Sequence, residues 1–382
     1  MNKTGINMER VKKENRSLIL KYINDNGPVS RIDIAEATGL TAASVTQITT
    51  ALIANGILKE LGSNPDAAKS AGRKKILLDI NPDAASVISV NIESEATTIC
   101  ISDIKGNIQN SLIRQIPTDK KVSPETFLSD VIVICKELLS ALPKKKRELV
   151  KCISIGTPGI VDRSEGIARH AYGIWDEPVD LRTIFAKEIS LPLILSNNVN
   201  AFSTAEILYG IGKSYESLLV IKWGPGVGSA IVTDKRVYEG RHGKTAELGH
   251  FIVDKNGKKC SCGRRGCLET MLSYSALKEI ADFKMEDFGN VYTSSTGAQK
   301  KAFTQAIDLF ARSIVNTGAL IAPNRIVLSG CLFKDEVIRN ALIECCRQYD
   351  PAYNEKRICY TALNSCESYI GPVAVYVNDF LF

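Results

Sequence analysis

The sequence predicts an α/β protein that begins with a winged helix-turn-helix. Three helical patterns separated by short polar turns occupy its N-terminal part, before two short apolar runs. In the rest of the chain, runs of strand length alternate with amphipathic helical runs, which is the order typical of α/β folds. Glycine-rich turns follow several strands, where such folds bind ligands. The 382 residues are 45% hydrophobic and 24% charged, so we expect a folded chain of more than one domain.

The helix-turn-helix is predicted from spacing and capping signals. Five apolar residues at helical spacing indicate the first helix: Val11, Leu18, Ile19, Tyr22 and Ile23. Ser30 is placed to cap a short helix over Arg31–Ala37. Gly39 supplies a tight turn, and Thr41 caps a third helix. A short helix, a glycine turn and a longer helix are the spacing of a helix-turn-helix.

The wing is predicted from two strands that follow these helices. Ile57–Leu61 and Lys75–Ile80 are apolar, and the polar segment Gly62–Gly72 lies between them. We expect this winged unit to cover residues 1–80, and an α/β domain to cover residues 84–382. Asn81–Pro82 then falls between the two.

The third helix and the wing are the candidate DNA-binding elements. Short polar side chains on the outward face of that helix suit base edges and phosphates: Ser44, Thr46, Gln47 and Thr50. The wing ends in a basic run, Arg73, Lys74 and Lys75, after a glycine that permits a close approach to DNA. Residues 1–80 hold 12 Lys and Arg against 8 Asp and Glu, which leaves most of the net charge of +6 here. The alternative is a three-helix protein-interaction module with a basic loop.

The second domain is predicted as strands interleaved with helices. The expected strands are Ser86–Ile92, Thr97–Ser102, Asn107–Gln115, Val150–Ile155, Leu193–Ser196, Leu218–Lys222 and Gly226–Thr233. Helices are expected over Pro124–Leu142 and from Ala201 to about Tyr209. The basic run Lys144–Arg147 is interpreted as solvated surface.

A cluster of metal-ligating residues is the most specific motif. His250 is followed by Cys260, Cys262 and Cys267, and three glycines nearby permit tight turns. One imidazole and three thiols are a tetrahedral donor set typical of structural Zn²⁺. Four protein ligands leave no open position, so a catalytic metal is disfavoured. The alternative is a loop with free thiols.

Two further motifs each allow two readings. The amides of Ser196–Asn200 follow a strand, so they could bind sugar hydroxyls or only cap the next helix. The glycine-rich segment Gly224–Ser229 could cradle a phosphate with its N–H groups or form a plain hairpin between two strands.

Together these segments resemble the ROK family (repressors, open reading frames and sugar kinases) over nearly the whole chain. The matching motifs are Ala246–His250 with Cys260, Cys262, Cys267 and Glu269; Gly156–Asp162; Ser196–Asn200; Gly224–Ser229; and Ser329–Cys331. The winged helix with Gly72–Leu78 is similar to the repressor branch, which includes xylose and N-acetylglucosamine repressors. The resemblance implies the actin-like sugar kinase (ROK) fold, with a cleft between two lobes.

Two departures from the family's kinases argue against phosphoryl transfer. Where those kinases have an ATP-binding Asp-x-Gly-Gly-Thr loop, this sequence reads Asn91–Glu95. Both glycines are missing, and we expect the carboxylates of Glu93 and Glu95 to face the part of the cleft where the phosphates would lie. Asn198 stands where the kinases have their catalytic Asp, and an amide cannot take up the proton of a sugar hydroxyl. We therefore expect no enzyme activity.

By resemblance, the sugar-recognising half of the kinase site remains: Asn197, Asn198, Glu247, His250 and Glu269. One His250 nitrogen would bind zinc while the other faces the sugar. Ser196 replaces the family's Glu, which leaves the identity of the sugar open.

We expect a sugar-responsive repressor of carbohydrate genes, such as genes of xylose metabolism. Its expected partners are operator DNA, a small sugar effector, structural zinc and a second copy of the chain, as a homodimer or a tetramer. A cytoplasmic location is expected, because the start has no signal-peptide pattern and no apolar run is long enough to span a membrane. The alternatives are an active sugar kinase with a DNA-binding domain, and a ligand-independent DNA-binding regulator on a degenerate ROK scaffold.

Overall fold

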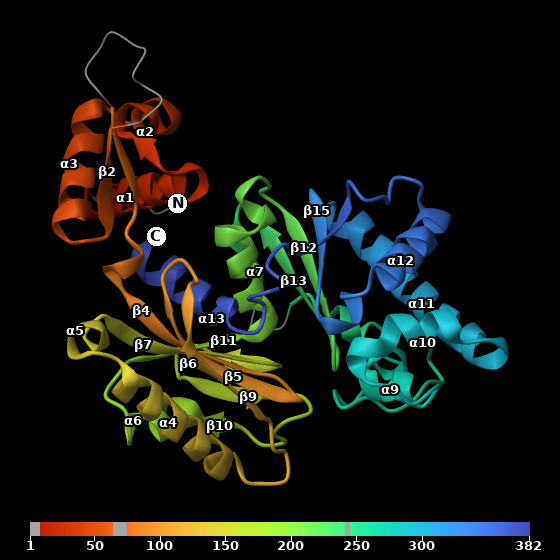
Figure 1. The fold of residues 1–382 in the computed structure, drawn as a ribbon. Coiled ribbons are helices and arrows are strands. Elements are labelled where there is room, and N and C mark those ends of the chain that lie inside the picture. Colours follow the sequence, from red (N-terminus) through yellow and green to blue (C-terminus); the bar gives the residue numbers. More distant parts are fainter. Residues whose placement is uncertain (1–7, 64–74, 241–244) are drawn as a thin grey trace, which may run out of the picture.

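The computed structural model describes residues 8–63, 75–240 and 245–382. Figure 1 shows a small helical unit above one α/β lobe (lobe 1) and beside a second (lobe 2), with helix α7 between the lobes. Both lobes are built on five-stranded mixed sheets, so the predicted α/β class is confirmed.

The N-terminal unit is a winged helix-turn-helix. Its elements are α1 (Met8–Asn26), β1 (Val29–Ser30), α2 (Arg31–Thr38), α3 (Ala42–Ala54), β2 (Leu58–Ser63) and β3 (Ile76–Ile80), and its strands are ordered β1-β3-β2. Ser30 and Asp33 form the expected capping box, and Thr41 accepts the backbone N–H of Ser44. Gly39 ends α2 with a φ of 69°, a conformation that glycine adopts readily. The two-residue strand β1 was not predicted, because it lies inside a capping signal.

Lobe 1 is a sheet ordered β11-β7-β4-β5-β6. Its elements are β4 (Ser86–Ile92), β5 (Ala96–Asp103), β6 (Ile108–Pro117), α4 (Pro124–Ala141), α5 (Lys144–Arg147), β7 (Val150–Thr157), α6 (Leu181–Ala186) and β11 (Leu193–Asn197). A small sheet of β8 (Ile160–Asp162), β9 (Ile167–His170) and β10 (Val179–Asp180) was not predicted. The strands β4 and β7 pair in parallel, and their apolar residues are buried against α4 on one face.

Lobe 2 is a sheet ordered β14-β13-β12-β15-β16. Its strands are β12 (Leu218–Trp223), β13 (Val227–Thr233), β14 (Arg236–Val237), β15 (Arg325–Ser329) and β16 (Ile358–Tyr360). Its helices are α8 (Glu269–Leu272), α9 (Tyr274–Lys278), α10 (Phe288–Ser294), α11 (Gly297–Ile321) and α12 (Glu336–Tyr349). Aromatic rings from these helices pack around Trp223, which is fully buried.

The helices α7 (Asn198–Tyr209) and α13 (Ile370–Tyr376) pack closely between the lobes. Gly371 permits this contact, because a Cβ atom there would lie 2.9 Å from the backbone N of Phe202. The helix α7 begins three residues before the expected Ala201, since its cap is Asn197.

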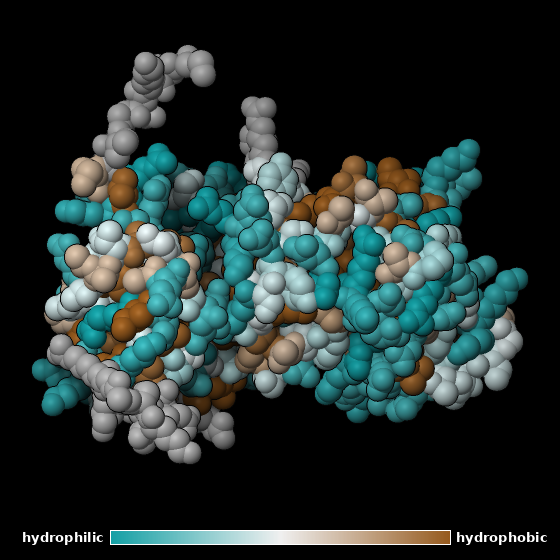
Figure 2. Space-filling model, turned by 90° about the horizontal axis from the view of Figure 1, so that it is seen from above, coloured by the Kyte–Doolittle hydropathy of each residue, from teal (hydrophilic) through white to brown (hydrophobic). Residues whose placement is uncertain are grey.

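The winged unit is not joined by an open linker. Asn81 caps a short 3-10 helix and donates a hydrogen bond to the Gly56 carbonyl. One hydrophobic cluster runs from α1 and β3 into α7 and α13. The described helices include none long and apolar enough to cross a membrane, and Figure 2 shows a largely hydrophilic face with small separate hydrophobic patches.

Candidate functional site

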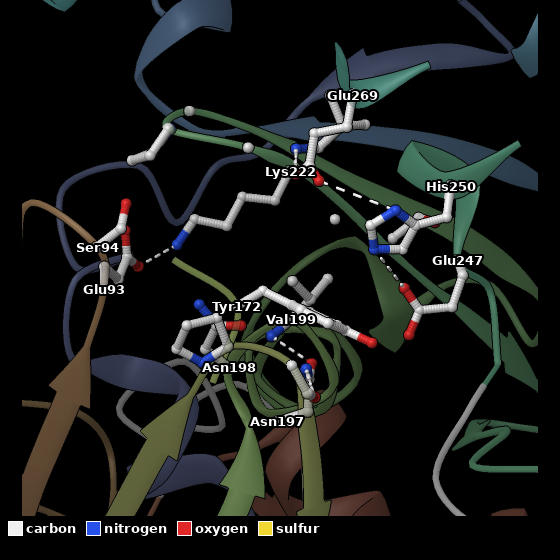
Figure 3. Close-up of a pocket in the computed structure, with 18 of the residues that line it drawn as sticks. Glu93, Ser94, Tyr172, Asn197, Asn198, Val199, Lys222, Glu247, His250 and Glu269 are labelled. Carbon is white, nitrogen blue, oxygen red and sulfur yellow. Dashed lines mark hydrogen bonds and ion pairs between the residues drawn. The ribbon is translucent and has the colours of Figure 1, made fainter. Parts of the chain in front are cut away.

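A cavity of about 140 Å³ lies at the meeting point of the two lobes. Its walls come from the ends of β4 and β7, the first turn of α7, the β12–β13 hairpin and the segment around His250. Figure 3 shows the polar side chains converging on it from both sides. Its volume is that of a single small ring, since a cavity of about 150 Å³ holds one benzene molecule.

The structure brings all five predicted sugar-binding residues to this cavity: Asn197, Asn198, Glu247, His250 and Glu269. They do not have equal freedom to bind a ligand. The Oδ1 atom of Asn197 accepts the backbone N–H groups of Val199 and Asn200, and its Nδ2 donates to the Gly159 carbonyl. Asn197 therefore caps α7, the simpler of the two readings of this motif. Asn198 lines the cavity and has no hydrogen-bond partner for its side chain among the described residues.

His250 lies between the cavity and the cysteine cluster. Its Nδ1 is 3.5 Å from the Cys260 Sγ and 3.9 Å from a Glu269 oxygen, whereas its Nε2 is 3.7 Å from a Glu247 oxygen (Figure 3). The ring is buried, and its edge packs against Tyr172. The Nδ1 atom thus faces the cysteine cluster and Glu269, whereas the Nε2 atom faces Glu247. This is the arrangement expected for a side chain that binds a metal through one nitrogen and a ligand through the other.

Glu269 is fixed by the β12–β13 hairpin. Its Oε1 accepts the backbone N–H of Val227 at 3.1 Å. Gly226 lies so near that a Cβ atom there would be 2.3 Å from the same oxygen. The glycine-rich segment is therefore a hairpin turn, and its small residues leave room for a carboxylate at the cavity wall.

The cysteine cluster has the geometry of a metal site. The ligand atoms of His250, Cys260, Cys262 and Cys267 all lie within 4.8 Å of one another. The Cys262 and Cys267 sulfurs are 3.6 Å apart, and bonds of about 2.3 Å in a tetrahedron would place sulfurs about 3.8 Å apart. The turns that form the cluster use left-handed glycines at Gly263 and Gly266. These four residues could hold one metal ion.

An ion triad crosses the inner end of the cleft, and sequence analysis missed it. The Lys222 ammonium contacts Glu93 from lobe 1 (Figure 3), and it lies 3.5 Å from Glu367. Burial alone would lower the pKa of Lys222, but the two carboxylates raise it. Burial raises the pKa of Glu367. The sequence feature that could have indicated this triad is the lysine inside the apolar run Leu218–Trp223.

The expectation that both carboxylates of Asn91–Glu95 face the cleft is only half correct. Glu93 lines the cavity, but Glu95 is exposed and pairs with Lys120 at 3.3 Å. Tyr172, which also lines the cavity, was missed because no motif marks it.

The predicted DNA-binding residues lie mostly on the outer side of α3. Thr46, Gln47 and Thr50 are exposed, whereas Ser44 is half-buried and its hydroxyl accepts from Thr41. Lys75 forms an ion pair with Asp33 at 2.9 Å. Arg73 and Lys74 lie outside the described residues.

Comparison with known proteins places both parts of the chain. The ROK family profile matches residues 87–370, and a winged helix-turn-helix DNA-binding profile matches residues 13–59. A putative xylose repressor from Caldicellulosiruptor sp. is 26% identical over 97% of both chains. The xylose repressor of Bacillus subtilis is 28% identical over 70% of this chain and 67% of its own. The DNA-binding transcriptional dual regulator NagC of Escherichia coli is 26% identical over 89% of this chain and 86% of its own.

Solved structures share the fold. A ROK family transcriptional regulator, a homologue of the E. coli MLC protein, has a TM-score of 0.78 at 24% identity, over 97% of this chain and 98% of its own. A ROK family glucokinase from Streptomyces griseus, solved with glucose and AMPPNP, has a TM-score of 0.63 at 19% identity, over 76% of this chain and 99% of its own. The family profile covers well over half of the sequence, and this chain is a member of the ROK family.

Proposed function

We propose that this protein is a sugar-responsive DNA-binding repressor of carbohydrate-utilisation genes. Residues 1–80 would bind the operator, and residues 84–382 would bind the sugar and dimerise. The observation that carries the proposal is the combination, in one chain, of an exposed reading helix with a cavity of monosaccharide size. The names of the xylose repressors and of NagC among the relatives agree with this function.

The sugar site would use neutral and anionic groups around the cavity. Asn198 offers an amide that has no partner among the residues the structure describes, and the carboxylates of Glu247 and Glu269 would accept hydrogen bonds from sugar hydroxyls. The imidazole Nε2 of His250 faces the same space. Asn197 would contribute mainly by fixing the start of α7.

We propose zinc as the metal held by His250, Cys260, Cys262 and Cys267. When bound, it would supply structural stabilisation and no reacting group, because the four protein ligands complete a tetrahedron. The metal would hold the segment that presents both His250 and Glu269 to the cavity.

The DNA-binding residues proposed on α3 are Ser44, Thr46, Gln47 and Thr50, with Arg73, Lys74 and Lys75 of the wing as phosphate contacts. Lys75 would have to exchange Asp33 for a phosphate. A homodimer, which could pair further into a tetramer, would read two half-sites about one helical turn apart. A cytoplasmic location follows from this role.

An active sugar kinase is the second candidate, favoured by the glucokinase likeness of the fold. Asn198 in place of a base and the Lys222 triad beside the cavity argue against it. A coupled assay for ADP release tests it, since sugar-dependent turnover that cavity variants abolish would establish the kinase.

The repressor proposal is tested by titrating the gene's own upstream DNA at fixed salt, with and without D-xylose, D-glucose and N-acetyl-D-glucosamine. One sugar is expected to weaken binding. Glu247→Gln should reduce that sugar's affinity about tenfold or more, because it removes a hydrogen bond to a charged group. It should leave operator affinity without sugar unchanged. Glu239→Gln, a carboxylate paired with Arg163 outside the cavity, is the matched control. An operator complex that no sugar alters, or a normal response in Glu247→Gln, would point to the ligand-independent scaffold.

A further inference from the structure

The winged unit contacts the two lobes through two different elements. On the side of lobe 1, Asp79 of β3 pairs with Lys105 in the β5–β6 turn at 2.6 Å. On the other side, α1 reaches α7 and lobe 2: Asn24 Nδ2 donates to the Leu208 carbonyl at 2.6 Å, and Asp25 pairs with Lys235 at 3.2 Å. The small unit therefore bridges the cleft that holds the candidate sugar site.

The contact with α7 joins two helix ends. The last carbonyl groups of a helix lack partners within it and carry partial negative charge. Here the Leu208 carbonyl near the end of α7 accepts from Asn24, and the Asn24 carbonyl near the end of α1 accepts the Lys213 ammonium at 3.0 Å. Lys235 also donates to the Lys213 carbonyl at 2.8 Å. These side chains thus provide hydrogen-bond donors for the backbone carbonyl groups at the two helix ends, whose partial negative charges would otherwise repel each other.

The turn that carries Lys235 is held in an uncommon conformation. Asp234 and Lys235 have φ angles of 51° and 54°, which non-glycine residues adopt rarely. The Lys235 backbone N–H donates to the Glu216 carbonyl at 2.9 Å. This turn joins two strands of lobe 2, so the anchor for Asp25 moves with that lobe.

The same helix α7 forms part of the sugar cavity. Its first residues line the cavity, and Leu208 in its last turn, about 15 Å away at 1.5 Å per residue, accepts the hydrogen bond from Asn24. Close packing makes α7 a stiff element, because Gly371 touches its middle and a Cβ at Gly228 would lie 2.7 Å from Val199 at its start. A displacement at one end is therefore carried to the other.

A second cavity lies along one face of α1. This cavity of about 640 Å³ separates Leu18 and Lys21 of α1 from Ala201 and Thr204 of α7. Burial and the nearby Arg236 lower the pKa of Lys21. The helix is thus fixed at its C-terminal end and has room to pivot about it.

We propose that the winged helix-turn-helix is anchored to both lobes at once, so that a change in lobe angle on sugar binding turns the reading helix through Asn24 and Lys235. This rests on the proposed function, since it names the route by which the sugar site acts on DNA. Coupling requires contacts that differ between the sugar-free and sugar-bound protein, and in this proposal they are Asn24 to Leu208 and Asp25 to Lys235.

The test uses the full-length protein and two variants, Asn24→Ala and Lys235→Met. Operator affinity is measured with and without the sugar panel, and sugar affinity with and without operator. Asn26→Ala is the control for the first variant, because in the described part of the chain its side chain bonds to Tyr22 of its own helix and not to either lobe. Asp234→Asn is the control for the second, as it keeps the turn.

In the wild type and the controls, sugar should weaken operator binding by one common factor. That factor should fall about three- to tenfold in each variant, because each loses one interdomain hydrogen bond or ion pair. Sugar affinity without DNA should stay unchanged. Full coupling in both variants would overturn the proposed route and leave the repressor function intact.

Failure of the repressor proposal itself would look different, since no sugar would alter operator binding by the wild type. Hydrogen exchange then tests whether the winged unit is anchored to the lobes, because this measurement needs only the protein and its operator DNA and no sugar. Operator binding should change exchange of residues 204–215 and 234–237 in the wild type but not in Asn24→Ala. Equal exchange in the free and DNA-bound wild type would overturn the inference.

Discussion

Replacing Lys222 by Met tests the energetic importance of the ion triad across the cleft. The Lys222 side chain is only 11% exposed, and it balances Glu93 and Glu367, which are 24% and 14% exposed. Met keeps the volume of the stem but leaves two carboxylates together with no cation. Removal of one partner from a buried ion pair costs about 3–5 kcal/mol, and we expect that loss in the free energy of unfolding at pH 7.

The loss should depend on pH, and its sign follows from Glu367. Burial already raises the pKa of Glu367, and Lys222 holds that rise in check. Without Lys222 the folded-state pKa rises further above that of the unfolded chain. Such a group stabilises the fold below its unfolded pKa, and this stabilisation is lost as the pH rises through the folded value. The variant should therefore lose more stability at pH 8 than at pH 5.

Urea unfolding followed by tryptophan fluorescence measures this effect. Trp223 adjoins Lys222, and the only other tryptophan is Trp175, so a Trp175→Phe background reports lobe 2 alone. Lys258→Met is the matched control, because its pair with Glu279 is exposed and should contribute at most about 1 kcal/mol. Adding Glu93→Gln to Lys222→Met should recover part of the loss. A loss below about 1 kcal/mol, or one equal at both pH values, would refute the reasoning.

Two further predictions concern the metal and the DNA contact. Cys260→Ser should lower bound zinc from one equivalent to well below one and lower the melting temperature, because a structural metal contributes folding free energy. Cys331→Ser changes an exposed cysteine outside the cluster and should alter neither quantity. An unaltered zinc content in Cys260→Ser would exclude this ligand set. Gln47→Ala should weaken operator binding by about 1–3 kcal/mol while binding to unrelated DNA stays the same, as expected for loss of a base contact. An equal loss of affinity for both DNAs would mean that Gln47 contacts the DNA backbone. Glu36→Gln on α2 serves as the control.

Local signals predicted the winged helix well. Capping residues such as Ser30 and Thr41 act through backbone groups within three residues, so they can be recognised in the sequence without tertiary information. The apolar strands of both lobes could be predicted for a similar reason, since a fully buried strand is a continuous apolar run. The strand β1 escaped because its two residues gain their pairing from β3, far along the chain.

The cavity was only partly predictable. The ligand set of His250, Cys260, Cys262 and Cys267 lies within eighteen residues, and its spacing alone indicates the chemistry. Asn197 shows the limit, because only the folded chain reveals that its amide is committed to the cap of α7. The triad joins Lys222 to Glu93, 129 positions before it, and to Glu367, 145 positions after it. No local sequence pattern indicates that these residues lie in contact.

That triad also bears on how such a chain could change over evolutionary time. Restoring an Asp at position 198 would return a proton acceptor, but Lys222 would still bridge Glu93 and Glu367 beside it. Changing Lys222 alone leaves two largely buried carboxylates without their cation, whereas changing one of the two glutamates still leaves a Lys–Glu pair. The order of changes therefore matters: a carboxylate of the triad can be replaced before Lys222 without stranding a buried charge, but Lys222 cannot be replaced first.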